Sequence, residues 1–276
     1  MPNMHLATES VSLIVDPEHG GRLASLEIAG SQVLVVEPTL GTLQWGSYPM
    51  VPWAGRIRDG SFAHGGITHQ MPCNLPPHAA HGTGFTSQWT VVDEATIALD
   101  LGSPWPFPGR VTQHFALSDD ELVITMSLSA AVDMPAMLGW HPWFARYMPV
   151  GDMPVGDMPI EDKRVEDERV EAELSFGSAM MYELDESAIP TGDLVTPPPG
   201  PWDNCFTSLQ RQPSIRWPGV LELDLQSSCD HWVIYTEPEH ALCVEPQSGP
   251  PDAFNRNPMV IEAGQDYQAW FRLAWR

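Results

Sequence analysis

Lysine is almost absent from this chain. Lys163 is the one lysine among 13 lysine and arginine residues, which stand against 36 aspartate and glutamate residues and leave a formal net charge of −23. Binding to phosphate-rich surfaces depends on clustered basic side chains. We therefore expect neither nucleic acid nor an anionic membrane as a partner, and a polyanionic substrate is disfavoured.

Signals for disulfide formation, secretion and membrane insertion are also missing. The four cysteines show no CxxC spacing, and the first residues, MPNMHLATES, contain no basic region followed by an apolar one. No apolar run approaches the roughly 20 residues that span a bilayer. The sequence thus predicts reduced thiols in a cytoplasmic protein.

Motifs of several enzyme classes are absent as well. The chain has no GxSxG, Walker A or strand-borne GxGxxG motif, so serine hydrolase and nucleotide-binding functions have no local support. His64, His69, His78 and His81 lie close together, which first suggests zinc, but no HExxH or Cys/His pairing accompanies them. We expect no metal and no cofactor, and we interpret His64 and His69 as surface or hydrogen-bonded residues.

Alternation of apolar and polar residues with a period of two dominates the chain and predicts antiparallel strands. The 28 prolines and 22 glycines favour many turns and few long helices. A single all-β domain spanning residues 1–276 is the expected organisation. The segments predicted as strands are VSLIV, RLASLEI, QVLVV, WTVVD, TIALDL, VTQHFAL, ELVITMSLSA, LELDL, HWVIY, ALCVE and YQAWFRLAWR.

One segment, at about residues 148–174, breaks this pattern. It begins with a tandem MPVGD repeat and continues as the charged run IEDKRVEDERVEAEL. Repeated proline, glycine and aspartate without an apolar face predict an exposed loop, and a regulatory or partner-binding role is the alternative. The charged run favours a solvated face, with a short helix supported by three i,i+4 pairs, Lys163–Asp167, Arg164–Glu168 and Arg169–Glu173.

The stretch CVEPQSGPPDAFN contains the strongest catalytic candidate, Glu245. A residue before proline is extended, and Pro246 cannot donate to a strand ladder, so we expect Glu245 at the end of a strand and facing a loop. Carboxylates in such places are often catalytic. The alternative is a solvated glutamate at a strand end.

Two histidines stand in similar settings. In GWHPWF, His141 precedes a proline after the strand-like AML and is flanked by aromatic residues, including Trp143. Such rings can exclude water and stack on the apolar face of a sugar, although an aromatic cluster is more often core. In HGTGF, His81 precedes glycines that allow close approach of the backbone to a ligand, and a plain turn is the alternative.

A charged pair of candidates comes from two further loops. Asp203 in PWDNCF follows a proline-rich run, where turn chemistry is the usual explanation. Arg56 and Arg58 lie in AGRIRDG, where one of them could clamp a ligand or both could pair with surface acids.

Taken together, these pieces resemble the aldose 1-epimerase (galactose mutarotase) family. The matching segments occur in the family's order and span about residues 48–255. They are AGRI at 54–57, HAAHG at 78–82, GWHPWF at 139–144, DNCF at 203–206 and EPQSGPPDAFN at 245–255.

The resemblance implies a galactose mutarotase-like β-supersandwich of mostly antiparallel strands with the sugar in an open cleft. Glu245 would be the general base and His141 the general acid, with opposite protonation near neutral pH. The substrate contacts would be Arg56, His81 and Asp203, with His78 and Trp143 as further candidates. The implied activity is cofactor-free exchange of the α and β anomers of a neutral hexose, by a monomer or homodimer.

One departure from the family pattern affects the substrate. Many members have asparagine before the arginine, where this chain has Gly55, so one sugar contact is missing or replaced. Two other functions are compatible with these motifs. A hexose-6-phosphate 1-epimerase would need two or three arginines converging at one end of the cleft. A non-catalytic carbohydrate-binding module would need no matched acid and base.

Overall fold

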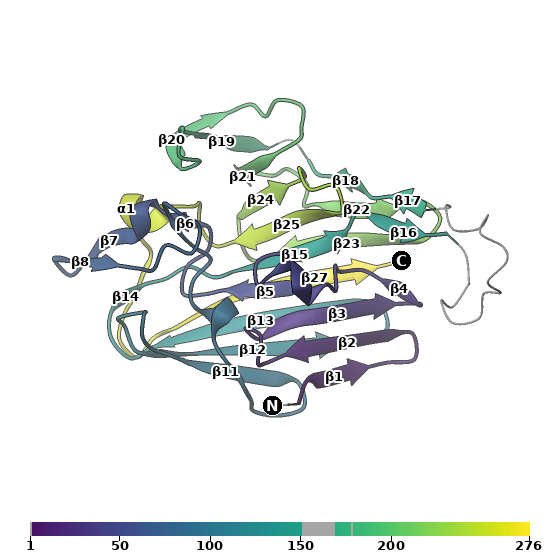
Figure 1. Ribbon diagram of the computed structural model, residues 1–276, viewed down its shortest axis with the longest axis horizontal. Coiled ribbons are helices and arrows are strands. Elements are labelled where there is room, and N and C mark those ends of the chain that lie inside the picture. Colours follow the sequence, from purple (N-terminus) through teal and green to yellow (C-terminus); the bar gives the residue numbers. More distant parts are fainter. Residues whose placement is uncertain (1, 151–168, 178) are drawn as a thin grey trace.

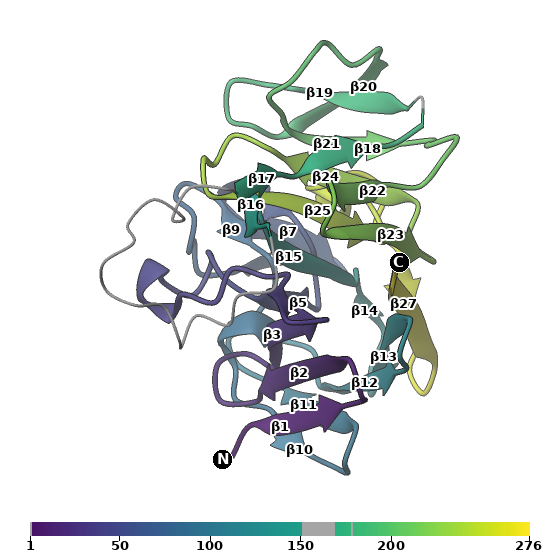
Figure 2. The same cartoon turned by 90° about the vertical axis from the view of Figure 1, so that its right-hand side faces the viewer.

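Two antiparallel β-sheets stacked face to face make up most of the molecule (Figures 1 and 2). They are seen in a computed structural model that describes residues 2–150, 169–177 and 179–276. In Figure 2 the sheets stand edge on, with β3, β5 and β15 in one layer and β13 and β27 in the other. The all-β architecture of mostly antiparallel strands predicted from the sequence is confirmed.

The larger sheet has eleven strands and contains the central strands that matter for function. Its strand order is β1 (Met4–Ala7), β2 (Val11–Asp16), β3 (Arg22–Ile28), β5 (Ser47–Met50), β15 (Gly139–Ala145), β25 (Ala241–Gln247), β24 (His231–Tyr235), β21 (Asp203–Thr207), β19 (Met180–Leu184) and β20 (Pro190–Val195), with β4 (Ser31–Gln32) paired to β3.

The second sheet has eight strands and covers the back of the first. Its strand order is β10 (Thr90–Val91), β11 (Thr96–Leu101), β12 (Gly109–Leu117), β13 (Glu121–Ala130), β27 (Asp266–Trp275), β23 (Leu221–Ser227), β22 (Ser214–Trp217) and β18 (Glu173–Ser175).

Short elements complete the fold, and helices are as scarce among the described residues as the sequence predicts. The two-stranded ladders are β6 (Arg56–Ile57) with β9 (Ala79–Ala80), β7 (Ser61–His64) with β8 (Ile67–Gln70), β14 (Met134–Pro135) with β26 (Val260–Ile261), and β16 (Tyr147–Pro149) with β17 (Arg169–Glu171). The helical elements are α1 (Ala253–Arg256) and the 3₁₀ turns η1 (Pro38–Leu40), η2 (Arg58–Gly60) and η3 (Gly84–Thr86).

The core lies between the two sheets, because alternate side chains of each strand point into the interface. Trp140 on β15 and Trp232 on β24 both pack against Phe271 on β27, with ring centroids 6.0 Å and 6.3 Å apart. The Trp140 indole also donates a hydrogen bond to Gln113 on β12. These contacts fix the outward face of β15, β25 and β24, which carries the candidate site.

The segment predicted as a loop at about 148–174 is partly strand. Met148 is buried in β16, which pairs with β17, and the chain runs from β17 directly into β18. The predicted i,i+4 helix pair Arg169–Glu173 is therefore wrong, because both residues lie in strands and Glu173 pairs instead with Arg216 across β18 and β22. The MPVGD repeat beyond Val150 and the pairs that involve Lys163 and Arg164 lie outside the described residues.

Two expectations about the whole chain can be compared with the structure. All four cysteines lie in the described part and are free thiols, as predicted. None of the helices described here has the length and apolar character that crossing a membrane requires.

Candidate active site

One row of side chains crosses the outward face of the larger sheet and contains both principal candidates. His141 on β15 stands opposite Tyr48 on β5, and Glu245 on β25 stands opposite Val233 on β24. In the middle of the row, His141 Nε2 lies 3.1 Å from Glu245 Oε1, with both side chains almost fully buried. The sheet register thus joins two motifs that are about a hundred residues apart in the sequence.

The strand-end expectation for these two residues is wrong. Glu245 lies inside β25, which continues through Pro246 to Gln247, and His141 lies inside β15 rather than after it. Each proline removes one backbone donor from the ladder. The flanking strands on both sides supply the remaining pairing, so a central strand tolerates the loss.

Aromatic rings hold the His141 imidazole from both sides. The Tyr48 ring stacks on it at 4.7 Å between centroids, and the Trp143 ring stacks at 5.3 Å with an interplanar angle of 13°. Trp143 follows two residues later on the same strand face, and His240 covers its other side. This packing leaves the imidazole little rotational freedom and keeps it directed at Glu245.

Arg56 and His81 reach the site together because their motifs pair as a small ladder. Arg56 on β6 is opposite Ala80 on β9, and the backbone N–H of His81 donates to the Gly55 carbonyl. The Arg56 guanidinium donates to Asp203 Oδ2 at 3.1 Å, and Asp203 begins β21 in the same sheet as Glu245. Three predicted contacts from three motifs are thus linked by one ion pair and one short ladder.

Backbone conformation and a close neighbour explain why residue 55 is glycine. Its φ of +66° is in the left-handed region, and a Cβ built there would lie 2.8 Å from the Pro251 ring. Pro251 belongs to the glutamate motif, so that motif fills the space where a side chain before Arg56 would begin. Pro251 in the pocket wall therefore occupies the space that an asparagine side chain at position 55 would need.

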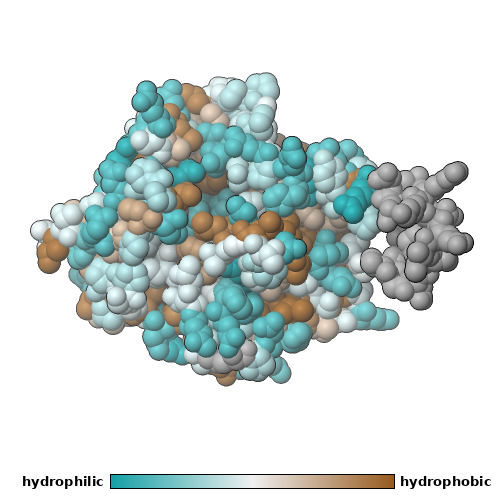
Figure 3. Space-filling view, viewed as in Figure 1, coloured by the Kyte–Doolittle hydropathy of each residue, from teal (hydrophilic) through white to brown (hydrophobic). Residues whose placement is uncertain are grey.

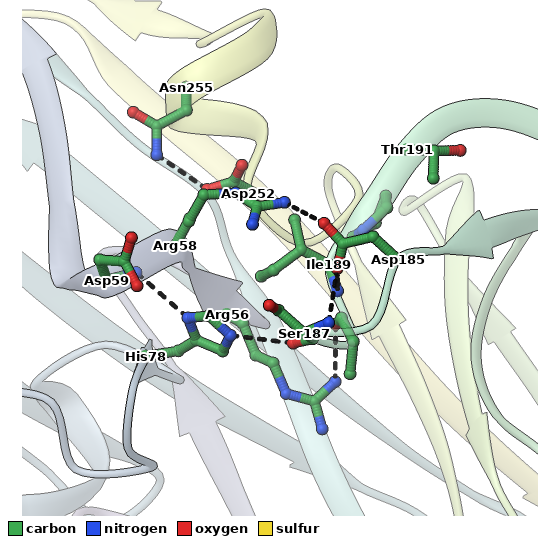
Figure 4. A network of polar contacts seen from close by, with 12 residues as sticks. Arg56, Arg58, Asp59, His78, Asp185, Ser187, Ile189, Thr191, Asp252 and Asn255 are labelled. Carbon is green, nitrogen blue, oxygen red and sulfur yellow. Dashed lines mark hydrogen bonds and ion pairs between the residues drawn. The ribbon is translucent and has the colours of Figure 1, made fainter.

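A turn of the β19–β20 hairpin is attached to the arginine loop at the edge of the site (Figure 4). Asp185 in the turn pairs with Arg58 and accepts backbone hydrogen bonds from Ser187 and Ile189. The Arg58 hydrogen bond lowers the pKa of Asp185 to about 2. Arg58 is therefore a structural partner of the hairpin, and Arg56 is the arginine that lines the pocket.

His78 belongs to this attachment and not to the pocket. Its Nδ1 accepts the backbone N–H of Asp59, which leaves Nε2–H to donate to the Ser187 carbonyl at 2.9 Å (Figure 4). Both ring nitrogens are used and the side chain is buried, so His78 has no free polar atom for a sugar. Its candidacy as a substrate contact is corrected to a structural role.

Asp252 joins the glutamate motif to the arginine motif. Its backbone N–H donates to the Arg56 carbonyl, and its Oδ1 accepts the backbone N–H of Arg58 at 2.9 Å and the Asn255 side-chain amide at 2.8 Å. The residue is buried and has a φ of +64°, a conformation that aspartate and asparagine tolerate better than alanine.

We expect Asp252→Ala to lower the free energy of unfolding by about 1–2 kcal/mol, because the partly buried N–H of Arg58 and the exposed amide of Asn255 lose their acceptor and alanine disfavours the positive φ. Asp252→Asn keeps the side-chain oxygen and the backbone preference, and should cost about half as much or less. Urea unfolding of both variants measures the difference. Equal losses would contradict this account of Asp252.

The outward face of the larger sheet and the loops of the arginine and histidine motifs line a pocket of about 190 Å³. Figure 3 shows apolar residues gathered in a band across the middle of the face seen in Figure 1, between more hydrophilic regions. Six of the predicted residues line the pocket, namely Arg56, His81, His141, Trp143, Asp203 and Glu245. Tyr48, Tyr235 and Gln247 also line it and were not predicted. Gln247 could have been found from the period-two pattern, since it follows Glu245 by two residues.

Burial dominates the electrostatics of the central pair. It raises the pKa of the Glu245 carboxyl well above its usual value, and the negative charge of Asp203 adds to the effect. It lowers the pKa of His141 well below its usual value, with His81 contributing. Burial, followed by the charge of Arg56, lowers the pKa of His81 to about 3. The pair therefore favours uncharged forms, unlike the oppositely charged pair expected from the sequence.

The site also contains one set of potential metal ligands. Among the described residues, the donor atoms of His141, Cys243 and Glu245 lie within 4.8 Å of one another, in the manner of a thiophilic metal site. Burial raises the pKa of the Cys243 thiol well above its usual value, which opposes thiolate ligation. His64 contacts the Asp133 carbonyl, as predicted for a hydrogen-bonded residue. His69 is half-buried and stacks on Phe62, and its Nε2 has no hydrogen-bond partner among the described residues, which differs from the surface or hydrogen-bonded role predicted for it.

Solved structures that share the fold of this chain confirm the predicted galactose mutarotase-like architecture. A putative aldose 1-epimerase from Escherichia coli K12 is 19% identical, with a TM-score of 0.80 over 100% of this chain and 99% of that one. A galactose mutarotase-like protein from Clostridium acetobutylicum is 16% identical, with a TM-score of 0.80 over 99% and 94%. A galactose 1-epimerase from Lactobacillus acidophilus NCFM is 13% identical, with a TM-score of 0.75 over 99% and 93%.

At these identities the solved structures show a common fold. The comparison with curated protein sequences gave no match. The sequence profile described as aldose 1-epimerase matches residues 4–274, which is nearly the whole chain and includes every motif of the pocket. The chain therefore belongs to the aldose 1-epimerase family.

Proposed function

We propose that the protein is a cofactor-independent mutarotase that interconverts the α and β anomers of a neutral hexose such as glucose or galactose. The observation that carries the proposal is the buried contact of 3.1 Å between His141 Nε2 and Glu245 Oε1 in the pocket. In a pyranose, O1 and the ring oxygen O5 are bonded to the same carbon. An acid and a base whose functional atoms are this close can reach both oxygens at once.

In the proposed reaction, Glu245 removes the proton of the O1 hydroxyl while His141 protonates O5. The C1–O5 bond breaks and C1 becomes an aldehyde. Rotation about C1–C2 presents the other face of the aldehyde to the O5 hydroxyl, which attacks C1 as His141 takes back its proton. Glu245 then returns a proton to O1. Arg56, His81 and Asp203 hold hydroxyl groups of the ring, and Trp143 offers an apolar face.

The pair needs one proton, and the resting site can supply it. In the empty pocket that proton resides on Glu245, because burial favours the neutral carboxyl and the neutral imidazole. Its transfer across the short contact to His141 produces the carboxylate base and imidazolium acid that ring opening requires. Each half-reaction takes one proton and returns one, so the pair ends as it began.

The charge of the pocket favours a neutral sugar over a sugar phosphate. Among the described residues that line it, Arg56 is the one arginine or lysine, and it already pairs with Asp203. Arg58 pairs with Asp185, and Arg22 donates to backbone carbonyls behind Tyr48. The described residues that line the pocket therefore do not include the two or three converging arginines that a phosphate site would need.

Polarimetry of freshly dissolved α-D-glucose and α-D-galactose tests the proposal, at a buffer concentration low enough to keep spontaneous mutarotation slow. Acceleration of either sugar by the protein supports a mutarotase. If saturation-transfer NMR shows sugar binding but the anomers exchange no faster, the protein is a binding module. Acceleration of a hexose 6-phosphate alone would contradict the neutral-sugar assignment.

We expect kcat/KM to remain level as the pH rises through 6.5, the ordinary pKa of histidine. The raised pKa of Glu245 keeps the single proton in the pair above that pH, and the lowered pKa of His141 keeps a second proton away below it. An exposed pair would instead lose its imidazolium and its activity above 6.5. Polarimetric rates corrected for the spontaneous reaction measure the profile, and a decline through 6.5 would contradict it.

A further inference from the structure

Gln247 lies next to the catalytic pair without belonging to it. It follows Glu245 by two residues on β25, so both side chains point to the pocket face. Its Nε2 donates to Glu245 Oε2 at 3.2 Å, while the other carboxyl oxygen, Oε1, faces His141 Nε2 at 3.1 Å. The amide therefore occupies one carboxyl oxygen and leaves the other for the imidazole.

A stabilising role does not explain this side chain. Gln247 is 0% exposed, and within the described part of the chain its Oε1 atom has no hydrogen-bond partner. A buried polar atom without a partner costs about 1–3 kcal/mol, so an apolar residue of the same length would serve packing better. Among the described residues, the hydrogen bond that the amide does make is the one from its Nε2 to Glu245.

We propose that Gln247 is a positioning residue, whose amide fixes the orientation of the Glu245 carboxyl so that Oε1 exchanges its proton with His141. This inference rests on the proposed function, because it concerns the same acid–base pair. Glu245 has other titratable or charged groups around it on the neighbouring elements. They are His141 on β15, Cys243 on β25, Tyr235 on β24, Asp203 and Cys205 on β21, Arg56 on β6, His81 directly after β9 and Tyr48 on β5.

The hydrogen bond from Gln247 lowers the pKa of Glu245, as the charge of Arg56 also does, whereas burial and Asp203 raise it. A donor to a carboxylate stabilises the ionised form and so lowers its pKa. Removing the amide should therefore raise the pKa of Glu245 further. In the one-proton pair, loss of the Glu245 proton limits activity at alkaline pH, so the alkaline limb of kcat/KM should move to higher pH.

Gln247→Met removes both polar atoms with little change in length, and Gln44→Met is the matched control. Gln44 also lines the pocket but makes no side-chain hydrogen bond to Glu245 among the described residues. We expect Gln247→Met to lower kcat on the order of tenfold and to shift the alkaline limb upward. Gln44→Met should leave the limb in place. Gln247→Asn, which withdraws the donor by one methylene, gives a second variant with the same expected direction.

An infrared titration of the Glu245 carboxyl tests the inference without any sugar. The C=O band of the neutral carboxyl is identified by its absence in Glu245→Gln, and its midpoint should move to higher pH in both Gln247 variants. A shifted midpoint in a protein that proves inactive supports the positioning role while the proposed function fails. An unchanged midpoint in both variants, or an equal shift in Gln44→Met, overturns the inference.

Discussion

Glu245→Gln should remove nearly all of the enzymatic acceleration of anomer exchange while leaving sugar affinity within about tenfold. The amide preserves the shape of the carboxyl but cannot accept the O1 proton at neutral pH. General acid–base catalysis contributes on the order of 10²–10⁴-fold, and a loss of this size in kcat is expected. Polarimetry gives the rate, and calorimetric or NMR titration with the sugar gives the affinity.

A control separates catalysis from the effect of replacing a glutamate by glutamine as such. Glu239 is exposed in the connection between β24 and β25, outside the catalytic pocket, so Glu239→Gln makes the same substitution without touching the pair. Its rate should stay within twofold of the unmodified protein. Full activity of Glu245→Gln would reject Glu245 as the base, and an equal loss in both variants would point to a non-specific cause.

His141→Asn should lower kcat by a similar factor, because asparagine cannot deliver a proton to the ring oxygen. The substitution also removes a ring packed between Tyr48 and Trp143, so the thermal midpoint must be measured alongside the rate. His240→Asn is the matched control, since His240 stacks on the far side of Trp143 and does not line the pocket.

The two histidine variants separate stacking from proton transfer. Loss of activity confined to His141→Asn supports its role as the acid. Comparable losses in both would show that support of the Trp143 ring is the relevant function. An active His141→Asn protein with a normal thermal midpoint would require another proton donor to the ring oxygen.

The strand pattern of this protein is largely determined by its local sequence. ELVITMSLSA and HWVIY are strands with the predicted ends, and most other predicted segments match within a few residues. Period-two alternation succeeds in ELVITMSLSA because the strand buries one face against the opposite sheet. QVLVV and WTVVD are the exceptions. Only Gln32 of QVLVV lies in β4, because Val33 and Leu34 pack into the core outside a regular ladder. In WTVVD, only Thr90 and Val91 form a strand.

The prediction that strands end at proline is wrong where a strand has neighbours on both sides. The rule that proline ends a strand describes local hydrogen bonding, and it placed Glu245 and His141 at strand ends. In the structure, β15 and β25 each keep enough pairing with flanking strands to continue through a proline. That pairing comes from segments far away in the sequence, so no local pattern could reveal it.

The sequence by itself determined which residue types the site contains, because the five motifs hold the proposed acid, the proposed base and the polar side chains in order. Tertiary structure alone decided which of them meet. Sheet register brought His141 within 3.1 Å of Glu245, and the hairpin turn paired with Arg58 and left Arg56 to line the pocket. The two nitrogens of His78 were taken up by Asp59 in the arginine loop and Ser187 in the hairpin turn. Burial then favoured uncharged forms of both residues in place of the expected charges, since desolvation depends on everything packed around a group and not on its neighbours in sequence.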